Sequence, residues 1–203
     1  MAKELVLGTG NRKKVVEIRA MVSEQVVRFV TLADLPDAIE VEESGTTFAE
    51  NARLKSTEQA KHLRRWVLAE DSGLSVAALD GAPGVYSARF SGEDATDERN
   101  NDLLLERLDG VALEKRSAYY SCYLSLSDPD GNERLTGRGE CHGRIIQQRH
   151  GSHGFGYDPM FEVPEYHLTF GQLGPAVKKA ISHRSRALRE FLPRMIALLS
   201  KES

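Results

Sequence analysis

The sequence predicts a single domain with a mixed sheet, of the α/β or α+β class. Short apolar runs alternate with helical segments along the chain, which is typical of a sheet covered by helices. One pair of segments closes around a tight turn at residues 128–132, which adds an antiparallel hairpin. The 203 residues are 40% hydrophobic and 28% charged, so they predict one globular domain over residues 1–203, without a separable linker.

The N-terminal part predicts a strand, a turn, a helix and a second strand. Residues 5–7 form an apolar run that ends at the turn Gly8-Thr9-Gly10-Asn11. A helix is expected from about Lys13 to residue 23, and residues 26–30 are expected to form the next strand. The strand and the helix therefore meet at a glycine turn.

A capping box marks the start of the second helix. Thr47 and Glu50 are three residues apart, the spacing at which each side chain bonds the other's backbone N–H. This helix is expected to end at about Leu63. Residues 66–69 then predict a buried strand that ends at the polar segment 70–73.

The C-terminal half predicts a helix, a hairpin and a final helix. Leucine spacing predicts a helix over residues 97–108, and strict alternation predicts a strand over residues 118–126. Residues 133–142 are expected to return beside it. The last helix is expected from about Ser182, with a kink or shift at Pro193.

Composition excludes several classes of protein. The net charge of −3 argues against binding long nucleic acid by bulk attraction. Cys122 and Cys141 lack the spacing of zinc or redox sites and are expected to be buried thiols. The N-terminus lacks a signal peptide, and no apolar run reaches the ~20 residues of a membrane span, so we expect a cytoplasmic protein without a membrane.

Four groups of polar residues are candidates for chemistry. The first surrounds the turn and helix start after the first strand, where backbone N–H groups and cations attract phosphate. The spacing is not that of a Walker A loop, and a capped turn with solvated lysines is the alternative. This group contains Thr9, Gly10, Asn11, Arg12, Lys13 and Lys14.

The second group is acidic. Glu40, Glu42 and Glu43 lie close together, and Glu70 and Asp71 follow the buried strand. Carboxylates at a strand end are typical ligands for Mg²⁺ held against a phosphate. The alternatives are a solvated acidic loop and an ordinary turn.

The third and fourth groups suit a flat base. Residues 154–159 (GFGYDP) place aromatic rings next to glycines, which suits stacking, although turn packing is the alternative. Residues 178–184 (KKAISHR) place cations and neutral donors at the expected start of the last helix. Positive charge is unfavourable at a helix N-terminus unless it holds an electron-rich ligand, and a solvated helix start is the alternative.

Together these groups indicate a nucleotide, and the chain resembles the inosine triphosphate pyrophosphatase family. Six matching stretches occur in the family's order and extend over nearly the whole chain. They are residues 9–17 (TGNRKKVVE), 47–55 (TFAENARLK), 71–76 (DSGLSV), 80–90 (DGAPGVYSARF), 154–161 (GFGYDPMF) and 181–188 (ISHRSRAL).

The resemblance implies an elongated two-lobed α/β fold, with a long mixed sheet flanked by helices and a nucleotide cleft between the lobes. It also implies a homodimer that requires Mg²⁺. The implied activity cleaves ITP, dITP and XTP between the α and β phosphates. The products are the monophosphate and pyrophosphate, so the enzyme cleanses the nucleotide pool of deaminated purines.

The resemblance also assigns roles to residues. Asp71 is the implied proton acceptor and a metal ligand, and Glu43 is the implied second metal carboxylate, with Glu42 as its close alternative. The implied substrate-binding residues form a phosphate cradle, a base-stacking loop and a set of base-edge readers. They are Thr9, Gly10, Asn11, Arg12, Lys13, Lys14, Lys55, Ser72, Phe155, Gly156, Tyr157, Asp158, Lys178, His183 and Arg184.

The chain departs from the family pattern at one place. Gln172 and Val177 stand where acidic residues are usual, which leaves the phosphate and metal positions untouched but affects base preference or lobe closure. Two other functions stay open. One is a Maf-type pyrophosphatase for pyrimidine or modified nucleotides, against which the Ser182-His183-Arg184 block argues. The other is a nucleotide-binding module without catalysis.

Overall fold

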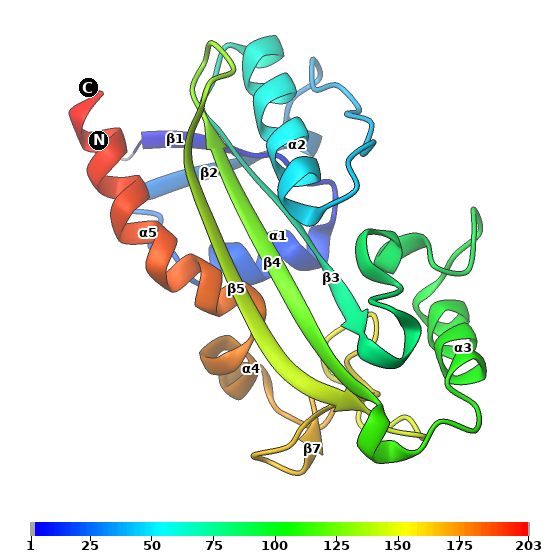
Figure 1. Cartoon of the computed structure of the whole chain (residues 1–203). Coiled ribbons are helices and arrows are strands. Elements are labelled where there is room, and N and C mark those ends of the chain that lie inside the picture. Colours follow the sequence, from blue (N-terminus) through cyan, green and yellow to red (C-terminus); the bar gives the residue numbers. More distant parts are fainter. Residues whose placement is uncertain (1–2, 203) are drawn as a thin grey trace. The chain divides into compact units, whose positions relative to one another are not determined.

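A mixed seven-stranded sheet flanked by five α-helices forms the protein, which a computed structural model describes over residues 3–202 (Figure 1). The strand order is β2-β1-β3-β4-β5-β6-β7. Strand β1 is parallel to β2 and β3, whereas β6 is antiparallel to β5 and β7, which confirms the predicted mixed sheet. The strands are β1 (Lys3–Leu7), β2 (Val27–Thr31), β3 (Val67–Val76), β4 (Ser117–Ser127), β5 (Glu133–Ile145), β6 (Phe161–Val163) and β7 (Leu168–Thr169). The helices are α1 (Arg12–Arg19), α2 (Phe48–Leu63), α3 (Asp97–Arg107), α4 (Pro175–Ile181) and α5 (His183–Lys201).

The chain divides into two compact units. The first unit comprises residues 1–71, 122–139 and 184–203, and the second comprises residues 72–121 and 140–183. Three of the four unit boundaries fall inside strands β3, β4 and β5, and the fourth falls at the start of α5. The single domain of the sequence analysis stays a prediction.

The core of the first unit shows which helix covers which face of the sheet. Leu5 and Leu7 of β1 pack in one buried cluster with residues of α1 and α5. Val6, between them, packs in a separate cluster with Ala60 of α2. Since side chains alternate along a strand, α1 and α5 cover one face and α2 covers the other.

The second unit has a core of its own, which is rich in aromatic rings. Phe161 and Phe170 stack with ring centroids 5.2 Å apart, and Tyr120 of β4 lies 4.7 Å from Phe161. Leu104 and Leu108 at the end of α3 join the same cluster. The leucines whose spacing predicted this helix therefore lie on its buried face.

Several predicted elements are confirmed. The capping box is present, since Glu50 N donates to Thr47 Oγ1 at 3.2 Å and Thr47 N donates to Glu50 Oε2 at 3.0 Å. Helix α2 ends at Leu63, as predicted. The turn at residues 128–132 closes with a 3.0 Å bond from Asp128 N to Asn132 O. Both cysteines are buried, and neither forms a disulfide bond.

Two predicted boundaries are wrong, and Lys178 lies on another helix than predicted, whereas the last helix begins at His183, within one residue of its predicted start. Helix α1 ends at Arg19, because Ala20 caps it and the chain turns there to reach β2. Strand β3 continues through the polar segment to Val76, so Asp71 lies inside a strand and not at its end. Lys178 belongs to α4, and Ser182 ends that helix, so the expected start of the last helix is a junction of two helices. Pro193 lies within a continuous α5.

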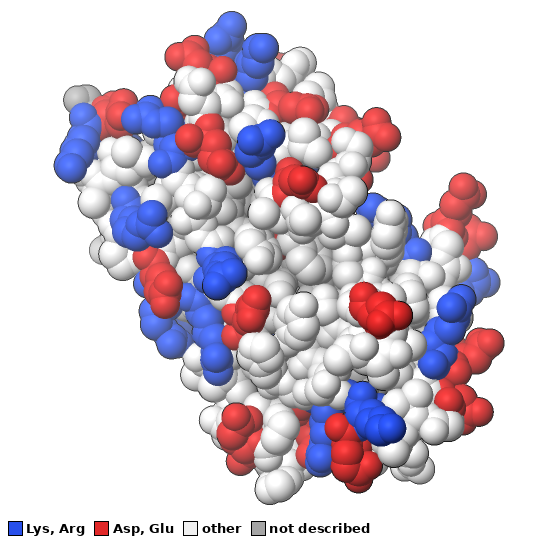
Figure 2. Space-filling view, viewed as in Figure 1, with Lys and Arg blue, Asp and Glu red and all other residues white. Residues whose placement is uncertain are grey.

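Charged side chains are interspersed on the surface. Figure 2 shows Lys and Arg mixed with Asp and Glu on the face drawn, in keeping with the small net charge. Over residues 3–202, no helix is both long and apolar enough to cross a membrane.

Candidate functional site

Two adjacent carboxylates on β3 organise the polar site of the first unit. Glu70 and Asp71 are successive strand residues, so their side chains leave opposite faces of the sheet. Both are buried, with exposed fractions of 1% and 6%. A buried carboxylate needs a charged or hydrogen-bonding partner, and each of the two finds its partners on different helices.

Asp71 meets α2. Lys55 Nζ lies 2.9 Å from Asp71 Oδ1 and 2.8 Å from Glu43 Oε1. Asn51, one turn before Lys55, donates its amide to Asp71 Oδ2 at 3.3 Å and accepts from Gly45 N at 2.8 Å. The helix that the capping box starts therefore carries both partners of Asp71 on one face.

Burial and ion pairing act against each other at this cluster. Burial raises the pKa of Asp71, an effect that Lys55 and Lys14 reduce but do not cancel. For Lys55, burial disfavours the charged form, but Asp71 and Glu43 outweigh it and raise the pKa of its ammonium. Asp71 is thus a stronger base than an ordinary aspartate.

The same residues fit a divalent cation. The carboxylates of Glu43 and Asp71 reach one ammonium, so their oxygens converge on a single cationic position. Two carboxylates that are completed by phosphate oxygens and water are a usual set of ligands for Mg²⁺. Glu42 is exposed, whereas Glu43 is half-buried and faces Lys55. Among residues 3–202, no three or more His, Cys, Asp and Glu side chains gather as a metal site of their own.

Glu70 meets α1 and α5 on the other face of the sheet. Arg184 donates to both Glu70 oxygens, with Nε at 2.7 Å and Nη2 at 3.0 Å, and also pairs with Glu17. Lys14 Nζ lies 3.0 Å from Glu70 Oε1. Burial opposes the charge on Glu70, but Arg184 and Lys14 outweigh it and hold its pKa well below the ordinary value. Arg184 is only 2% exposed, and its role as a base-edge reader stays a prediction.

The start of α1 is built as a capped turn. Asn11 Oδ1 accepts from Lys13 N at 3.0 Å and from Lys14 N at 3.2 Å, and Asn11 N donates to Thr9 Oγ1 at 3.2 Å. The residues from Gly10 to Lys13 are exposed, and Lys14 is half-buried. The capped-turn alternative and the phosphate cradle are therefore compatible, since the cap leaves the cationic side chains accessible.

The second unit carries the predicted stacking loop. Asp158, 2% exposed, accepts from Phe155 N at 2.8 Å and pairs with Lys178 Nζ at 2.6 Å through the same oxygen, Oδ2. Lys178 Nζ also lies 4.7 Å from the centre of the Phe155 ring. The loop and α4, 20 residues apart, are thus joined by one buried ion pair and one cation–π contact.

Two further predicted residues are held by the aromatic core of this unit. His183 stacks on Tyr120, with ring centroids 4.8 Å apart. Tyr157 is buried and donates its hydroxyl to Ser87 O at 2.9 Å. Burial also raises the pKa of Tyr157, so this hydroxyl stays a donor. Ser72, the remaining predicted contact, is half-buried on β3.

Sequence reasoning missed several residues of these sites. Glu17 and Asn51 each lie one helical turn from a predicted lysine, Lys14 and Lys55, and that spacing is a local signal. Tyr120, Asp97 and Asn101 reach the second-unit residues only through the fold, and no local spacing indicates them.

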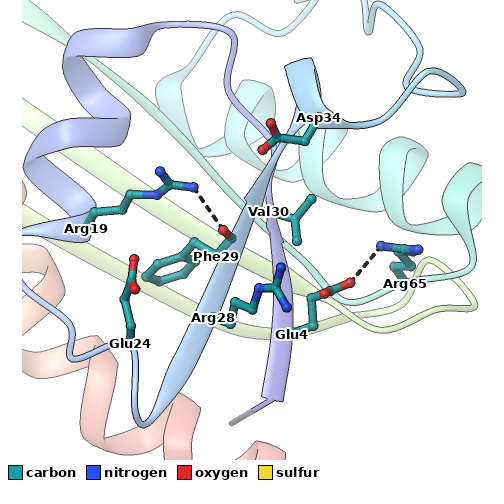
Figure 3. A pocket seen from close by; sticks show the side chains of 8 residues that line it. All are labelled: Glu4, Arg19, Glu24, Arg28, Phe29, Val30, Asp34 and Arg65. Carbon is teal, nitrogen blue, oxygen red and sulfur yellow. Dashed lines mark hydrogen bonds and ion pairs between the residues drawn. The ribbon is translucent and has the colours of Figure 1, made fainter.

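The first unit also has a pocket of about 670 Å³ that is lined by none of the predicted site residues (Figure 3). It opens beside β2, the outer strand of the sheet. Two of its basic side chains have partners, since Arg65 pairs with Glu4 at 2.8 Å and Arg19 donates to Phe29 O at 2.9 Å. The lining residues are Glu4, Arg19, Glu24, Arg28, Phe29, Val30, Asp34 and Arg65, and no predicted site residue is among them.

The chain matches the Ham1 family over residues 5–194. A dITP/XTP pyrophosphatase of Rhodopirellula baltica is 57% identical over 200 residues, which cover 98% of this chain and 96% of that protein. A second dITP/XTP pyrophosphatase, from Listeria monocytogenes, is 41% identical, with 98% of this chain and 97% of that protein covered.

Two solved structures are similar to this chain over most of its length. The Ham1 protein of Coxiella burnetii superimposes with a TM-score of 0.86 at 35% identity, over 98% of this chain and 99% of that one. The nucleoside-triphosphatase / dITP/XTP pyrophosphatase of Mycobacterium abscessus superimposes with a TM-score of 0.76 at 39% identity, over 92% of this chain and 97% of that one.

Proposed function

Because this chain belongs to the Ham1 family, we propose that it is a pyrophosphatase for deaminated purine nucleoside triphosphates: dITP, XTP and ITP. The observation that carries the proposal is the 57% identity, over 98% of the chain, to a dITP/XTP pyrophosphatase. The reaction hydrolyses the bond between the α and β phosphates and releases the monophosphate and pyrophosphate. Its role is to remove these nucleotides from the pool.

The first unit supplies the groups for the phosphates. A triphosphate is strongly anionic, so Lys14, Lys55 and the exposed cationic side chains at the start of α1 are suited to bind it. Glu43 and Asp71 would hold a Mg²⁺ ion, which when bound neutralises phosphate charge and lowers the pKa of water. The two lysines also stabilise the charge that develops on departing pyrophosphate.

Asp71 is suited to accept the proton of the attacking water. Its burial raises the pKa of its carboxyl group, and a general base gains strength as its pKa approaches the working pH. Asn51 and Lys55 hold its two oxygens and so orient the carboxylate. A covalent intermediate is not needed, because a water positioned by this carboxylate is a sufficient nucleophile.

The second unit supplies the groups for the base. Phe155 offers a ring for stacking, and Lys178 and His183 offer donors, while Arg184, the further predicted reader, belongs to the first unit. Hypoxanthine and xanthine present a 6-oxo acceptor, whereas adenine presents a 6-amino donor. A buried donor left unpaired costs ~1–3 kcal/mol, so two of them discriminate by about 10².

The test is a substrate profile in excess Mg²⁺. Initial rates are measured on dITP, XTP, ITP, GTP and ATP at equal concentration, with pyrophosphate and orthophosphate assayed separately. We expect pyrophosphate as the product and rates on dITP and XTP about 10² above the rate on ATP. Orthophosphate as the sole product, or tight binding of dITP without turnover, would overturn the proposal.

Three finer expectations accompany this function. A nucleotide cleft between two lobes, a homodimer and a cytoplasmic location stay predictions from the resemblance and from composition. Light scattering coupled to size exclusion tests the dimer, because one chain has a mass of 22.5 kDa.

A further inference from the structure

Helix α3 holds both sides of one glycine in the stacking loop. Asp97 Oδ2 accepts from Gly156 N at 3.0 Å, and Asn101 Nδ2 donates to Gly156 O at 3.1 Å. Asp97 and Asn101 are four residues apart, so they lie on one face of the helix. The two peptide groups that flank Gly156 are therefore fixed from a single rigid element.

Burying the Asn101 side chain costs free energy, which argues that its amide has a functional role. The side chain is 5% exposed, and among residues 3–202 no donor reaches its buried Oδ1. A buried polar atom without a partner costs ~1–3 kcal/mol, whereas an apolar side chain at this position would avoid that cost. The one hydrogen bond that the structure gives to this side chain is the bond to Gly156 O.

These bonds complete a set of restraints around Phe155. On its N-terminal side, Asp158 accepts from Phe155 N at 2.8 Å. On its C-terminal side, Asp97 and Asn101 hold Gly156, whose φ of 60° lies in the left-handed region where other residues are strained. Every backbone bond named here comes from a side chain of the second unit, so the loop geometry depends on those side chains.

We propose that Asp97 and Asn101 are positioning residues that set the base specificity of this enzyme, by fixing the peptide groups beside the base-stacking Phe155. The inference rests on the proposed function, since it assigns that loop to the base. Neither residue is assigned a contact with the triphosphate, so their loss changes base recognition more than it changes the hydrolytic step. A ring whose backbone is free to turn loses the orientation that separates a 6-oxo from a 6-amino purine.

Asn100 provides a matched control. It is adjacent to Asn101, equally buried at 4% exposure, and also bonds backbone groups of the second unit. Its Oδ1 accepts from Ser91 N and Ser91 Oγ, each at 2.8 Å, and its Nδ2 donates to Ala88 O at 3.1 Å and to Ser87 O at 3.4 Å. Asn100→Ala therefore removes the same side chain from the same helix without removing a bond to the loop.

The experiment compares N101A, N100A, D97A and D97N in full-length protein. Each is assayed for kcat and KM on dITP and dATP, and its thermal midpoint is recorded. For N101A and D97A we expect KM for dITP to rise about tenfold, with kcat within about threefold of wild type. The preference for dITP over dATP should fall by a similar factor.

Two variants separate positioning from general structure. N100A should keep the KM and the preference for dITP, even where its midpoint falls as far as that of N101A. D97N keeps an oxygen acceptor but loses the negative charge at the start of α3, so it should recover to within about threefold of wild type. If Asp97 acted through the helix dipole alone, D97N would behave like D97A.

The results of this experiment distinguish a failure of this inference from a failure of the proposed function. If wild type hydrolyses dITP to pyrophosphate while N101A and D97A keep their KM and preference, the inference is wrong and the function stands. It is also wrong if N100A changes the preference as much as N101A does. If wild type fails to release pyrophosphate from dITP, the function itself is wrong.

Discussion

The two units of this molecule satisfy their buried polar groups in different ways. The first unit pairs carboxylates with side-chain cations, as Glu70 does with Lys14 and Arg184. In the second unit, the half-buried Asp97 and the buried Asn101 instead pair with backbone groups, those of Gly156. Charge is suited to binding any triphosphate, whereas a fixed backbone is suited to one base shape, so the division matches the two parts of a nucleotide.

Within the first unit, two adjacent residues of β3 differ in their partners and in their proposed roles. Glu70 and Asp71 face opposite sides of the sheet, so Glu70 joins α1 to α5 while Asp71 faces Lys55 and Asn51 of α2. Cations hold the pKa of Glu70 low, whereas burial raises the pKa of Asp71. The first carboxylate is therefore suited to stabilise the fold and the second to accept a proton.

The largest expected effect is on stability, from Glu70→Gln. It removes the buried carboxylate that Arg184 and Lys14 share, although Glu17 still pairs with Arg184, so we expect the free energy of unfolding to fall by about 3–5 kcal/mol in urea denaturation. Glu162→Gln in the second unit is the matched control. Its partner Arg144 is 35% exposed, so the expected loss there is about 1 kcal/mol or less. Equal losses in the two units would contradict the comparison.

The same variant gives a prediction on pH. The folded pKa of Glu70 lies well below its ordinary value of 4.5, so its contribution to stability is present above that value. It is lost as the pH falls through the folded pKa. The difference in unfolding free energy between wild type and Glu70→Gln should therefore stay constant from about pH 7 to pH 5 and shrink in stronger acid. A difference that stays constant into stronger acid, or one that grows as the pH falls from 7 to 5, would show that the folded pKa of Glu70 is not lowered.

Asp71→Asn should separate activity from stability. We expect the rate of pyrophosphate release from dITP to fall by ~10² or more, because the proposed general base is lost. The unfolding free energy should fall little, since burial already disfavours the charged form of Asp71. Asp130→Asn, which alters an exposed pair with Arg64, is the control and should keep its activity. A large stability loss without a loss of rate would reverse the roles of Glu70 and Asp71.

Lys178→Met tests the second unit through the buried ion pair of Lys178 with Asp158. Met fills a similar volume but removes the cation that pairs with the Asp158 carboxylate beside Phe155 N. We expect KM for dITP to rise about tenfold, with a smaller change in kcat. Lys179→Met changes the exposed neighbour on α4 and should leave both constants near wild type. A fall in kcat alone would place Lys178 in the hydrolytic step instead.

The smallest effects should come from the helix caps, one in each unit. Thr47 Oγ1 accepts from Glu50 N, and Thr96 Oγ1 accepts from Arg99 N, each at 3.2 Å. Thr47→Ala and Thr96→Ala should each lower the unfolding free energy by about 1 kcal/mol. Kinetic constants on dITP should change little. A change in base preference in either variant would mean that the cap also positions substrate groups.

Local patterns in the sequence predicted much of this fold. The Thr47 capping box, the alternation from residue 118 to residue 126 and the turn at residues 128–132 depend on neighbours within a few positions. Such features are set by backbone geometry and by local hydrogen bonds, so they are visible in the chain itself. The stretches that resemble the family likewise indicated the candidate residues before any tertiary contact was known.

Tertiary structure decided which of these residues meet. The polar segment at Glu70 was expected to end its strand, but β3 continues, because cations from α1, α2 and α5 compensate its carboxylates. Strand periodicity then turns two adjacent acids toward different helices. The sequence by itself determined helices, turns and candidate chemistry. The pairing of distant side chains depended on strand order and packing, because contacts between remote segments leave no local spacing to detect. The hydrogen bonds between α3 and Gly156 are an example.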